Sequence, residues 1–244
     1  SPTVVLETGT TDRSATYISG SASSTLVFSY TVQVGDTSAD LDYVATSSLS
    51  LNGSTISDVA GNNAVVTLAA PGAAGSLGAA QAIVIDTTAP SIPTASVATG
   101  SDSGSSTSDG ITSDTTPTIN VIAAEAGGTV TVTASKSGQS DVVCSMTGST
   151  GGSTCDLGTL VEGTWTVSVK QSDAATNVGT ATSLTVVIDT TAPTPTMSTQ
   201  SLKSSASVTV RSNEIGTAYL VKSTVSVSAL VDITGSADAD WSQI

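Results

Sequence analysis

Acidic side chains are the residues of this chain that could do chemistry, because the usual catalytic and metal-binding alternatives are scarce. The sequence has 20 Asp and Glu against 6 Lys and Arg, a formal net charge of −14, and no histidine. Without histidine the chain lacks the commonest general base, the Ser-His-Asp triad and the usual zinc ligand. Gathered carboxylates bind hard cations such as calcium, whereas scattered carboxylates keep an exposed protein soluble. The positions of the acids must decide between these two interpretations.

Two of the acids recur in the same surroundings. Segment 83–90 reads IVIDTTAP and segment 186–193 reads VVIDTTAP, so Asp86 and Asp189 are 103 residues apart (189 − 86). That spacing is about the size of one β-sandwich domain. Each copy is an apolar strand that ends on Asp and runs into proline, which cannot continue a strand ladder. The repeat therefore predicts domain boundaries near residues 90 and 193.

The elements between these boundaries are predicted to be strands. Only 3% of residues are aromatic, so the core must be built from Val, Ile, Leu and Ala, and no long apolar stripe of helical period occurs. Alternation in segment 164–170 places Trp165 in the core. The strands expected in the middle of the chain are 94–98, 118–123, 129–135, 141–146, 164–171 and 180–188. Shorter ones are expected at 3–7, 207–211, 217–222 and 230–233, and Trp241 lies outside any clear strand.

The predicted fold class is therefore all-β, with immunoglobulin-like β-sandwich modules in a linear array. Residues 1–90 form a first module that lacks its opening strands, residues 91–192 a complete module, and residues 193–244 the N-terminal part of a third. A piece as short as the third rarely buries enough surface to fold alone. We expect the sequence to be an excerpt from a longer repeat array.

Cys144 and Cys155 flank a Gly- and Ser-rich turn, 11 positions apart. A metal site would need further Cys or His partners, which the sequence does not have. A disulfide that staples a β-hairpin is favoured over two free thiols, and it would indicate an oxidising compartment.

A second repeat is found in two short polar segments, Asp58 to Asn62 (DVAGN) and Asp173 to Asn177 (DAATN). Asp and Asn tolerate left-handed backbone and cap their own turns, so both segments are predicted to be hairpin turns. Thr176 stands where the first copy has Gly61, and we expect the second turn to be less tightly closed.

These motifs resemble the tandem immunoglobulin-like repeats of giant bacterial surface adhesins, of the biofilm-associated and RTX type. The resemblance is carried by VIDTTAP, by the DxAGN turn, and by segments 100–135, 15–62 and 207–238, and it covers nearly the whole chain. It implies an extender that projects an adhesive tip from the cell, with calcium at the module junctions stiffening it. The resemblance is specific for the type of repeat and not for any one protein.

Strand order predicts where calcium would bind. The last hairpin of the middle module should lie near the start of that module, which brings Asp173 and Asn177 towards Asp86. Glu125, in a turn after an early strand, should lie near Asp189 at the exit. Each junction would then offer carboxylate, amide and carbonyl oxygens, of which calcium needs six to eight.

Weaker calcium candidates lie elsewhere. Asp102, Asp109 and Asp114 share one Ser- and Gly-rich loop, and Asp58 and Asn62 form the first turn. Asp36, Asp40 and Asp42 alternate too regularly to close on one ion without a tight turn. For every one of these acids the alternative is a solvated turn residue.

The function expected from these observations is that of a structural extender of a bacterial cell-surface adhesin, not an enzyme. Two alternatives remain: a subunit of an extracellular filament, and a carbohydrate- or peptide-binding module. The expected cofactor is calcium, and the expected partners are neighbouring modules of the same protein, with possible self-association. The acidity argues against nucleic acid as a partner. No apolar run could cross a bilayer, so direct membrane insertion is not expected. The expected disulfide favours secretion, with the bacterial cell surface as the location.

Overall fold

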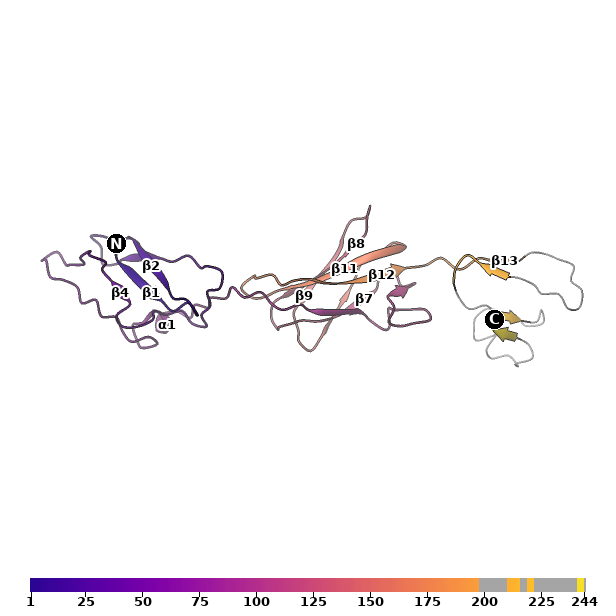
Figure 1. Ribbon diagram of the computed structural model, residues 1–244, viewed down its shortest axis with the longest axis horizontal. Helices are drawn as coiled ribbons and strands as arrows, with labels where there is room; N and C mark the ends of the chain where they lie inside the picture. Colours follow the sequence, from indigo (N-terminus) through magenta and orange to yellow (C-terminus); the bar gives the residue numbers. More distant parts are fainter. Residues whose placement is uncertain (198–209, 216–218, 222–240, 244) are drawn as a thin grey trace, which may run out of the picture. The chain divides into compact units, whose positions relative to one another are not determined.

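The computed structural model describes residues 1–197, 210–215, 219–221 and 241–243 (Figure 1). It divides into two compact units, Ser1–Asp189 and Thr190–Ile244. Strands make up nearly all of its regular structure, and α1 (Leu77–Ala80) is the one α-helix among the described residues. The predicted all-β class is confirmed.

Residues 1–90, which we call the N-terminal module, contain one four-stranded sheet. Its strand order is β3-β2-β1-β4, with β1 at Thr3–Leu6, β2 at Arg13–Ser19, β3 at Val27–Ser29 and β4 at Leu49–Ser50. The buried apolar side chains of this module are Leu6, Ala15, Leu41, Tyr43 and Ile85. Long loops connect the strands, so most of the module is irregular in its backbone.

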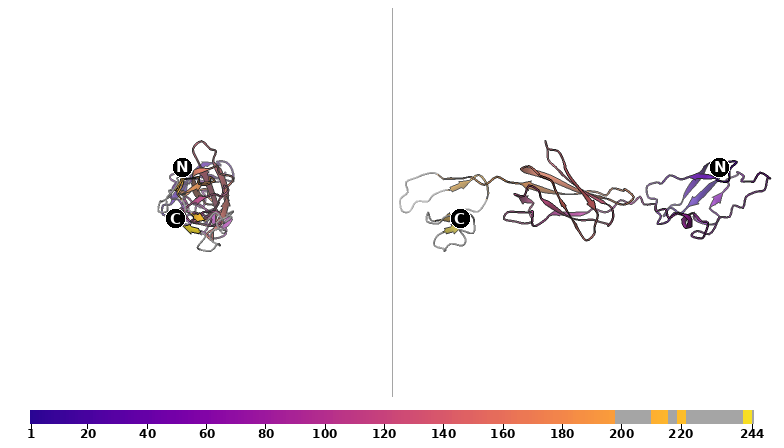
Figure 2. Two further views of the ribbon diagram at one scale, coloured as in Figure 1. Left: turned by 90° about the vertical axis from the view of Figure 1, so that its right-hand side faces the viewer. Right: turned by 180° about the vertical axis from the view of Figure 1, so that it is seen from behind.

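Residues 91–189, which we call the central module, form two facing sheets, visible as layers in Figure 2. A three-stranded sheet has the order β10-β7-β5 and a five-stranded sheet has the order β6-β12-β11-β8-β9. The strands are β5 (Thr94–Val97), β6 (Ile111–Thr112), β7 (Thr118–Ile122), β8 (Thr129–Ser135), β9 (Val142–Thr147), β10 (Ser153–Asp156), β11 (Gly163–Ser172) and β12 (Thr182–Ile188).

The core of the central module lies between its two sheets. Alternating residues of β11 point inward, and Trp165 is 2% exposed, as the alternation predicted. Its indole Nε1 donates a hydrogen bond of 2.8 Å to the Val161 carbonyl, so the buried polar atom is satisfied. The six strands predicted for this module are present, within one or two residues at each end. The short strands β6 and β10 were not predicted.

Cys144 and Cys155 are joined by a disulfide, but the predicted hairpin is wrong. β9 pairs with β8 in one sheet, whereas β10 pairs with β7 in the other. The turn between β9 and β10 therefore crosses from sheet to sheet, and the disulfide links the two layers. The prediction failed because a Gly- and Ser-rich connection between two short strands looks the same in sequence whether or not the strands pair.

The second compact unit contains two pairs of short antiparallel strands among its described residues. β13 (Pro195–Met197) pairs with β14 (Val210–Ser212), and β15 (Tyr219–Val221) pairs with β16 (Trp241–Gln243). Trp241 thus lies within a strand, contrary to expectation. The strand expected at 230–233 lies outside the described residues.

Candidate functional site

The segment that connects the N-terminal and central modules, residues 85–90, is bonded to both of them. Ile85 pairs with Ser38 of the N-terminal module in an isolated β-bridge. The Asp86 carbonyl accepts a 3.0 Å hydrogen bond from Nδ2 of Asn177, in the last hairpin of the central module. The predicted approach of Asn177 to Asp86 is therefore present. The Asp86 carboxylate instead caps its own turn, accepting from the Thr88 N–H at 2.8 Å.

Gly179 brings this hairpin close to the connector. A Cβ at that position would lie 2.4 Å from the Pro90 carbonyl oxygen, a distance that real Cβ atoms do not show. Glycine is thus the residue that allows the two backbones to approach. The connector is fixed on this side by a side-chain hydrogen bond and by a close backbone contact.

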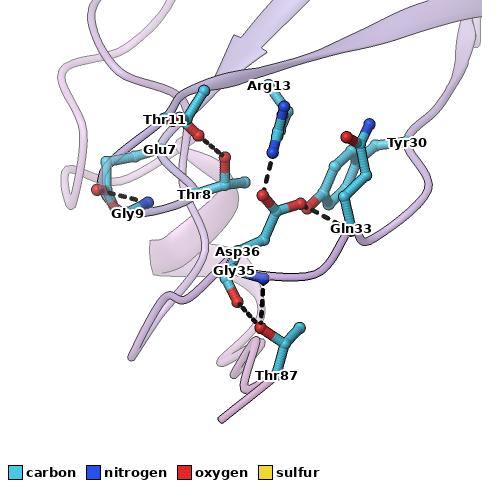
Figure 3. Close-up of polar contacts among 10 residues, drawn as sticks. All are labelled: Glu7, Thr8, Gly9, Thr11, Arg13, Tyr30, Gln33, Gly35, Asp36 and Thr87. Carbon is cyan, nitrogen blue, oxygen red and sulfur yellow. Dashed lines mark hydrogen bonds and ion pairs between the residues drawn. The ribbon is translucent and has the colours of Figure 1, made fainter.

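On the other side Thr87 fixes the connector to the loop around Asp36 (Figure 3). Its hydroxyl donates to the Asp36 carbonyl at 3.0 Å and accepts from the Gly35 N–H at 3.0 Å. Thr87 was not among the residues predicted from the sequence. The repetition of Thr-Thr after Asp in both copies of the motif was the signal that could have identified it.

The Asp36 carboxylate is the centre of a buried polar cluster in the N-terminal module (Figure 3). It accepts from Arg13 Nε at 2.8 Å, from the Gln33 N–H at 2.8 Å and from the Tyr30 hydroxyl. The Tyr30 hydrogen bond, together with Arg13, lowers the pKa of Asp36 although burial opposes the shift. Burial, and then the contact with Asp36, raises the pKa of Tyr30 to about 12. These partners make the Asp36 carboxylate a structural acceptor that ties β2 to the loop of residues 30–36.

Asp42 acts in the same way on a different loop. Its oxygens accept from the N–H groups of Tyr43, Gly72 and Leu77, at 2.8, 2.9 and 3.2 Å. Burial raises the pKa of Asp42, but these and further hydrogen bonds outweigh burial and leave it lowered. The carboxylate therefore holds the loop that leads into α1, and Asp36 and Asp42 have separate sets of partners.

The two polar turns have the same internal structure. In each, the Asp carboxylate accepts from both the backbone and the side-chain amide of the Asn four positions later, at 2.7 to 2.8 Å. Thr176 has φ 72° and Gly61 has φ 87°. The expectation of a looser second turn is therefore wrong, because Thr176 takes the left-handed conformation that glycine takes in the first.

These hydrogen bonds also set the acidity of the two turn carboxylates. Those that Asn62 donates lower the pKa of Asp58. Burial raises the pKa of Asp173, but the hydrogen bonds from Asn177 outweigh it and the pKa is lowered. The turns differ in their surroundings, because only Asn177 also reaches the connector.

Glu125 lies at the opposite end of the central module from the predicted place. Its carbonyl oxygen accepts from Nε2 of Gln171, at the end of β11, where Ser172 pairs with Thr129. The strand before Asp189 ends where Ile188 pairs with Gly163, at the start of β11. Glu125 therefore shares an end with Asp173. The prediction treated the turn of Glu125 as the first connection of the module, whereas the first connection is the loop from residue 98 to residue 117, between β5 and β7.

That loop, and not Glu125, lies beside Asp189. The Asp189 N–H donates to the Thr112 carbonyl at 2.9 Å. Within the loop, Asp109 caps the Ile111 N–H and Asp114 caps the Thr116 N–H, as turn residues do. The hydrogen bond from Thr116 lowers the pKa of Asp114. Asp102 differs from both, since it is 2% exposed and its Oδ1 has no hydrogen-bond partner among the residues that the structure describes.

The described part of the chain contains no group of three or more Asp, Glu, Cys or His side chains placed to hold a metal ion. At the connector, the Asp86 carbonyl and the Asp173 carboxylate flank the Asn177 amide, at 3.0 and 2.7 Å from its Nδ2. Their oxygens are of the type that calcium prefers, but six ligands would require further carbonyls or water. In this arrangement Nδ2 of Asn177 donates to both oxygens, so Asp173, Asn177 and the Asp86 carbonyl would hold calcium only with the amide turned to present its oxygen.

Two facing sheets of three and five strands enclose Trp165 and are joined by a disulfide, and their strands are antiparallel except for the parallel pair of β6 and β12. This arrangement defines an immunoglobulin-like β-sandwich. Residues 88–190 match the family model of a bacterial Ig-like domain. This family consists of structural, non-catalytic domains that are common in bacterial surface and extracellular proteins. The match covers the central module and less than half of the chain. A search of curated proteins found no match.

Among the described residues, none of the helices has the length and apolar character needed to span a lipid bilayer.

Proposed function

We propose that this chain is an extender segment of a bacterial cell-surface adhesin, in which successive Ig-like modules hold an adhesive region away from the cell. The match of residues 88–190 to bacterial Ig-like domains supports the structural role. The recurrence of the same strand-to-proline motif at both ends of the central module supports a serial arrangement. Calcium at the connector would neutralise the carboxylates there and fix the angle between modules.

The observation that carries this proposal is the bonding of the connector from both modules. Thr87 is tied to residues 35 and 36, and the Asp86 carbonyl is tied to Asn177. A small polar junction with few contacts leaves domains free to move relative to one another. Hydrogen bonds from both sides reduce that freedom. A spacer requires such restricted motion between its modules, whereas an independent binding domain does not require it.

The test is whether Asn177 restricts the motion of the two modules relative to each other. Residual dipolar couplings on the whole chain give one alignment tensor for each module, and two rigidly connected modules share the same tensor. We expect Asn177→Ala to increase the difference in magnitude between the two tensors, relative to the parent protein in the same buffer. Asn62→Ala is the matched control, because it removes the same bonds from the equivalent turn but none from the connector. Equal tensors in Asn177→Ala would contradict the proposal.

The calcium part of the proposal is tested separately. We expect millimolar calcium to bring the two tensors closer together and EDTA to separate them, with chemical-shift changes at Asp173 and Asn177. Ligand that binds only the native state also stabilises it, by about 2.7 kcal/mol at a hundredfold excess over Kd. Identical tensors and identical thermal melts in calcium and in EDTA would reject calcium stiffening but not the spacer role.

A further inference from the structure

The strand β3 forms a free edge of the sheet in the N-terminal module. In the order β3-β2-β1-β4, β3 pairs with β2 alone. Tyr17 of β2 lies opposite Phe28, and the Tyr17 N–H donates to the Pro2 carbonyl, on the side of β1. Because N–H and C=O of one residue point to the same side of an antiparallel strand, Tyr17 and Phe28 are not hydrogen-bonded to each other. The N–H and C=O of Phe28 therefore point away from β2, and no other backbone group of the described residues bonds to them.

The segment that carries this edge has a composition that favours strand pairing. Residues 26–34 read LVFSYTVQV, rich in β-branched and aromatic side chains and without proline or glycine. Its apolar side chains stay accessible, since Val27 is 41% and Val32 is 50% exposed. The Tyr30 hydroxyl donates to the buried Asp36 carboxylate, which holds the segment on the module (Figure 3). The edge is therefore fixed in position, apolar and uncovered.

The edge also lacks the charges that usually protect an edge strand. Natural sheets block free edges with charged side chains, with proline or with a covering segment. Segment 20–35 contains no Asp, Glu, Lys or Arg. In the whole chain 20 acidic residues outnumber 6 basic ones, so most contacts between copies bring carboxylates together. Two copies of this segment bring none together, and a partner of opposite charge would gain nothing from it.

A groove of about 910 Å³ lies beside the start of the segment. Tyr17, Leu26, Ile56 and Val59 line it, together with several serines. Leu26 belongs to the edge segment, so a strand that pairs with β3 would run past the groove and place side chains over its apolar atoms. Covering this surface adds hydrophobic stabilisation to the main-chain hydrogen bonds.

We propose that two copies of this chain associate through β3, by antiparallel pairing of their free edges across a two-fold axis. The backbone groups of Phe28 and Tyr30 supply the hydrogen bonds, as in other cases of strand addition. The same segment lies on both sides, so the interface is isologous and closes at a dimer. The opposite edge of the sheet, β4, has only two residues and offers no comparable ladder. This association acts between chains and does not depend on the spacer proposal.

The test is sedimentation equilibrium of the whole chain at concentrations up to about 0.5 mM, where a contact with a Kd below about 1 mM is populated. We expect a monomer–dimer equilibrium. Raising the salt from about 0.05 M to about 0.5 M should shift it towards the dimer, because salt screens the repulsion between two chains of net charge −14. Hydrogen exchange at the Phe28 and Tyr30 amides should slow at least tenfold in the dimer, because pairing protects them.

Charged variants locate the contact. Val27→Lys places two like charges on the paired edges and should weaken the dimer Kd at least tenfold. Val32→Lys should have the same effect, and because Val32 lies outside β3 the shared effect would not come from damage to that strand. Val143→Lys is the matched control. It makes the same change at a 57% exposed valine on β9, an edge strand of the central module, and should leave the Kd unchanged.

Four results would overturn the proposal. The first is a chain that stays monomeric at about 0.5 mM in about 0.5 M salt, where a Kd below about 1 mM would show. The second is a dimer that Val143→Lys weakens as much as Val27→Lys does, and the third is a dimer in which the Phe28 and Tyr30 amides exchange at the monomer rate. In both, the contact lies elsewhere. The fourth is a species larger than a dimer, since pairing of one edge closes. None of these results decides the comparison of Asn177→Ala with Asn62→Ala, so the two proposals fail separately.

Discussion

The N-terminal and central modules have interiors of different chemistry. In the central module fourteen buried apolar residues form one cluster, and a disulfide joins its two sheets. In the N-terminal module the cluster has five buried apolar residues, and two carboxylates, Asp36 and Asp42, lie beside it as acceptors for loops and side chains. The comparison indicates that buried carboxylates can position long loops where regular strands and apolar side chains are few.

This difference implies that the two modules respond to different changes. Loss of packing volume or of the disulfide should affect the central module, whereas loss of charge should affect the N-terminal module. Hydrogen exchange with mass spectrometry measures the protection of peptides from each module in the same sample, so the two responses can be separated within the whole chain.

The largest effect is expected from Trp165→Ala. Removing a fully buried tryptophan leaves a cavity between the two sheets and costs about 3–5 kcal/mol of unfolding free energy. Peptides of β8, β11 and β12 should lose protection in denaturant, whereas peptides of β1 and β2 should not. Equal loss of protection in both modules would show that they unfold as one unit, and the comparison would then fail.

Reduction of the disulfide should have the next largest effect. In the chain-entropy model, the bond between Cys144 and Cys155 stabilises the module by roughly 2–3 kcal/mol. Reducing agent should therefore lower the protection of β7, β9 and β10 and leave the N-terminal module unchanged. Alkylation of the non-reduced protein, counted by mass spectrometry, is the control. Two modified cysteines would contradict the disulfide itself.

Most of the central module could be predicted from sequence because apolar side chains, mainly Val and Trp165, alternate with polar ones along its strands. The pairing of β9 and β10 in different sheets could not, because local pattern does not specify which strands are neighbours. Glu125 was placed at the wrong end for a related reason. The chain reverses direction at each connection, so counting the loop after the short strand β5 as the first connection moves every later turn to the opposite end of the module. The roles of Asp36 and Asp42 depend on contacts with residues far away in the sequence, such as Leu77, 35 positions after Asp42, and Thr87, 51 positions after Asp36, which spacing does not reveal.

Acid should destabilise the N-terminal module more than the central one, because three carboxylates with a lowered pKa lie in the N-terminal module (Asp36, Asp42 and Asp58) and two lie in the central module (Asp114 and Asp173). The pKa values of Asp36 and Asp42 are lowered in the folded state, so the unfolded state binds more protons at low pH. Their contribution is complete above the ordinary value of about 3.8 and is lost as pH falls through the folded values. Protection of β1 and β2 should therefore begin to fall as the pH drops below about 3.8, before that of β8 and β11.

Asp42→Ala is the matched variant for this measurement. At pH 7 it leaves the N–H groups of Tyr43, Gly72 and Leu77 without their acceptor and should cost roughly 2 kcal/mol. Its acid sensitivity should be smaller than that of the parent, since one of the two buried carboxylates is gone. If the central module loses protection first on acidification, the carboxylates are not what holds the N-terminal loops.

The smallest expected effect comes from exchanging the residues that distinguish the two polar turns. Thr176 is exposed and has φ 72°, a conformation that costs a β-branched residue about 1 kcal/mol or more. Thr176→Gly should relieve this strain and stabilise the central module by about 1 kcal/mol, reduced by the greater chain entropy of glycine. Gly61→Thr should destabilise the N-terminal module by a similar amount, because a Cβ there meets no atom within 4 Å and only the backbone conformation opposes it.

The measurement is the midpoint of unfolding in denaturant for each module. A higher midpoint in Thr176→Gly and a lower one in Gly61→Thr would show that the two turns are energetically equivalent, so that the modules differ only in their interiors. If Thr176→Gly is neutral or destabilising while Gly61→Thr is costly, Thr176 makes a compensating contribution near the connector, and the difference between the modules extends to their turns.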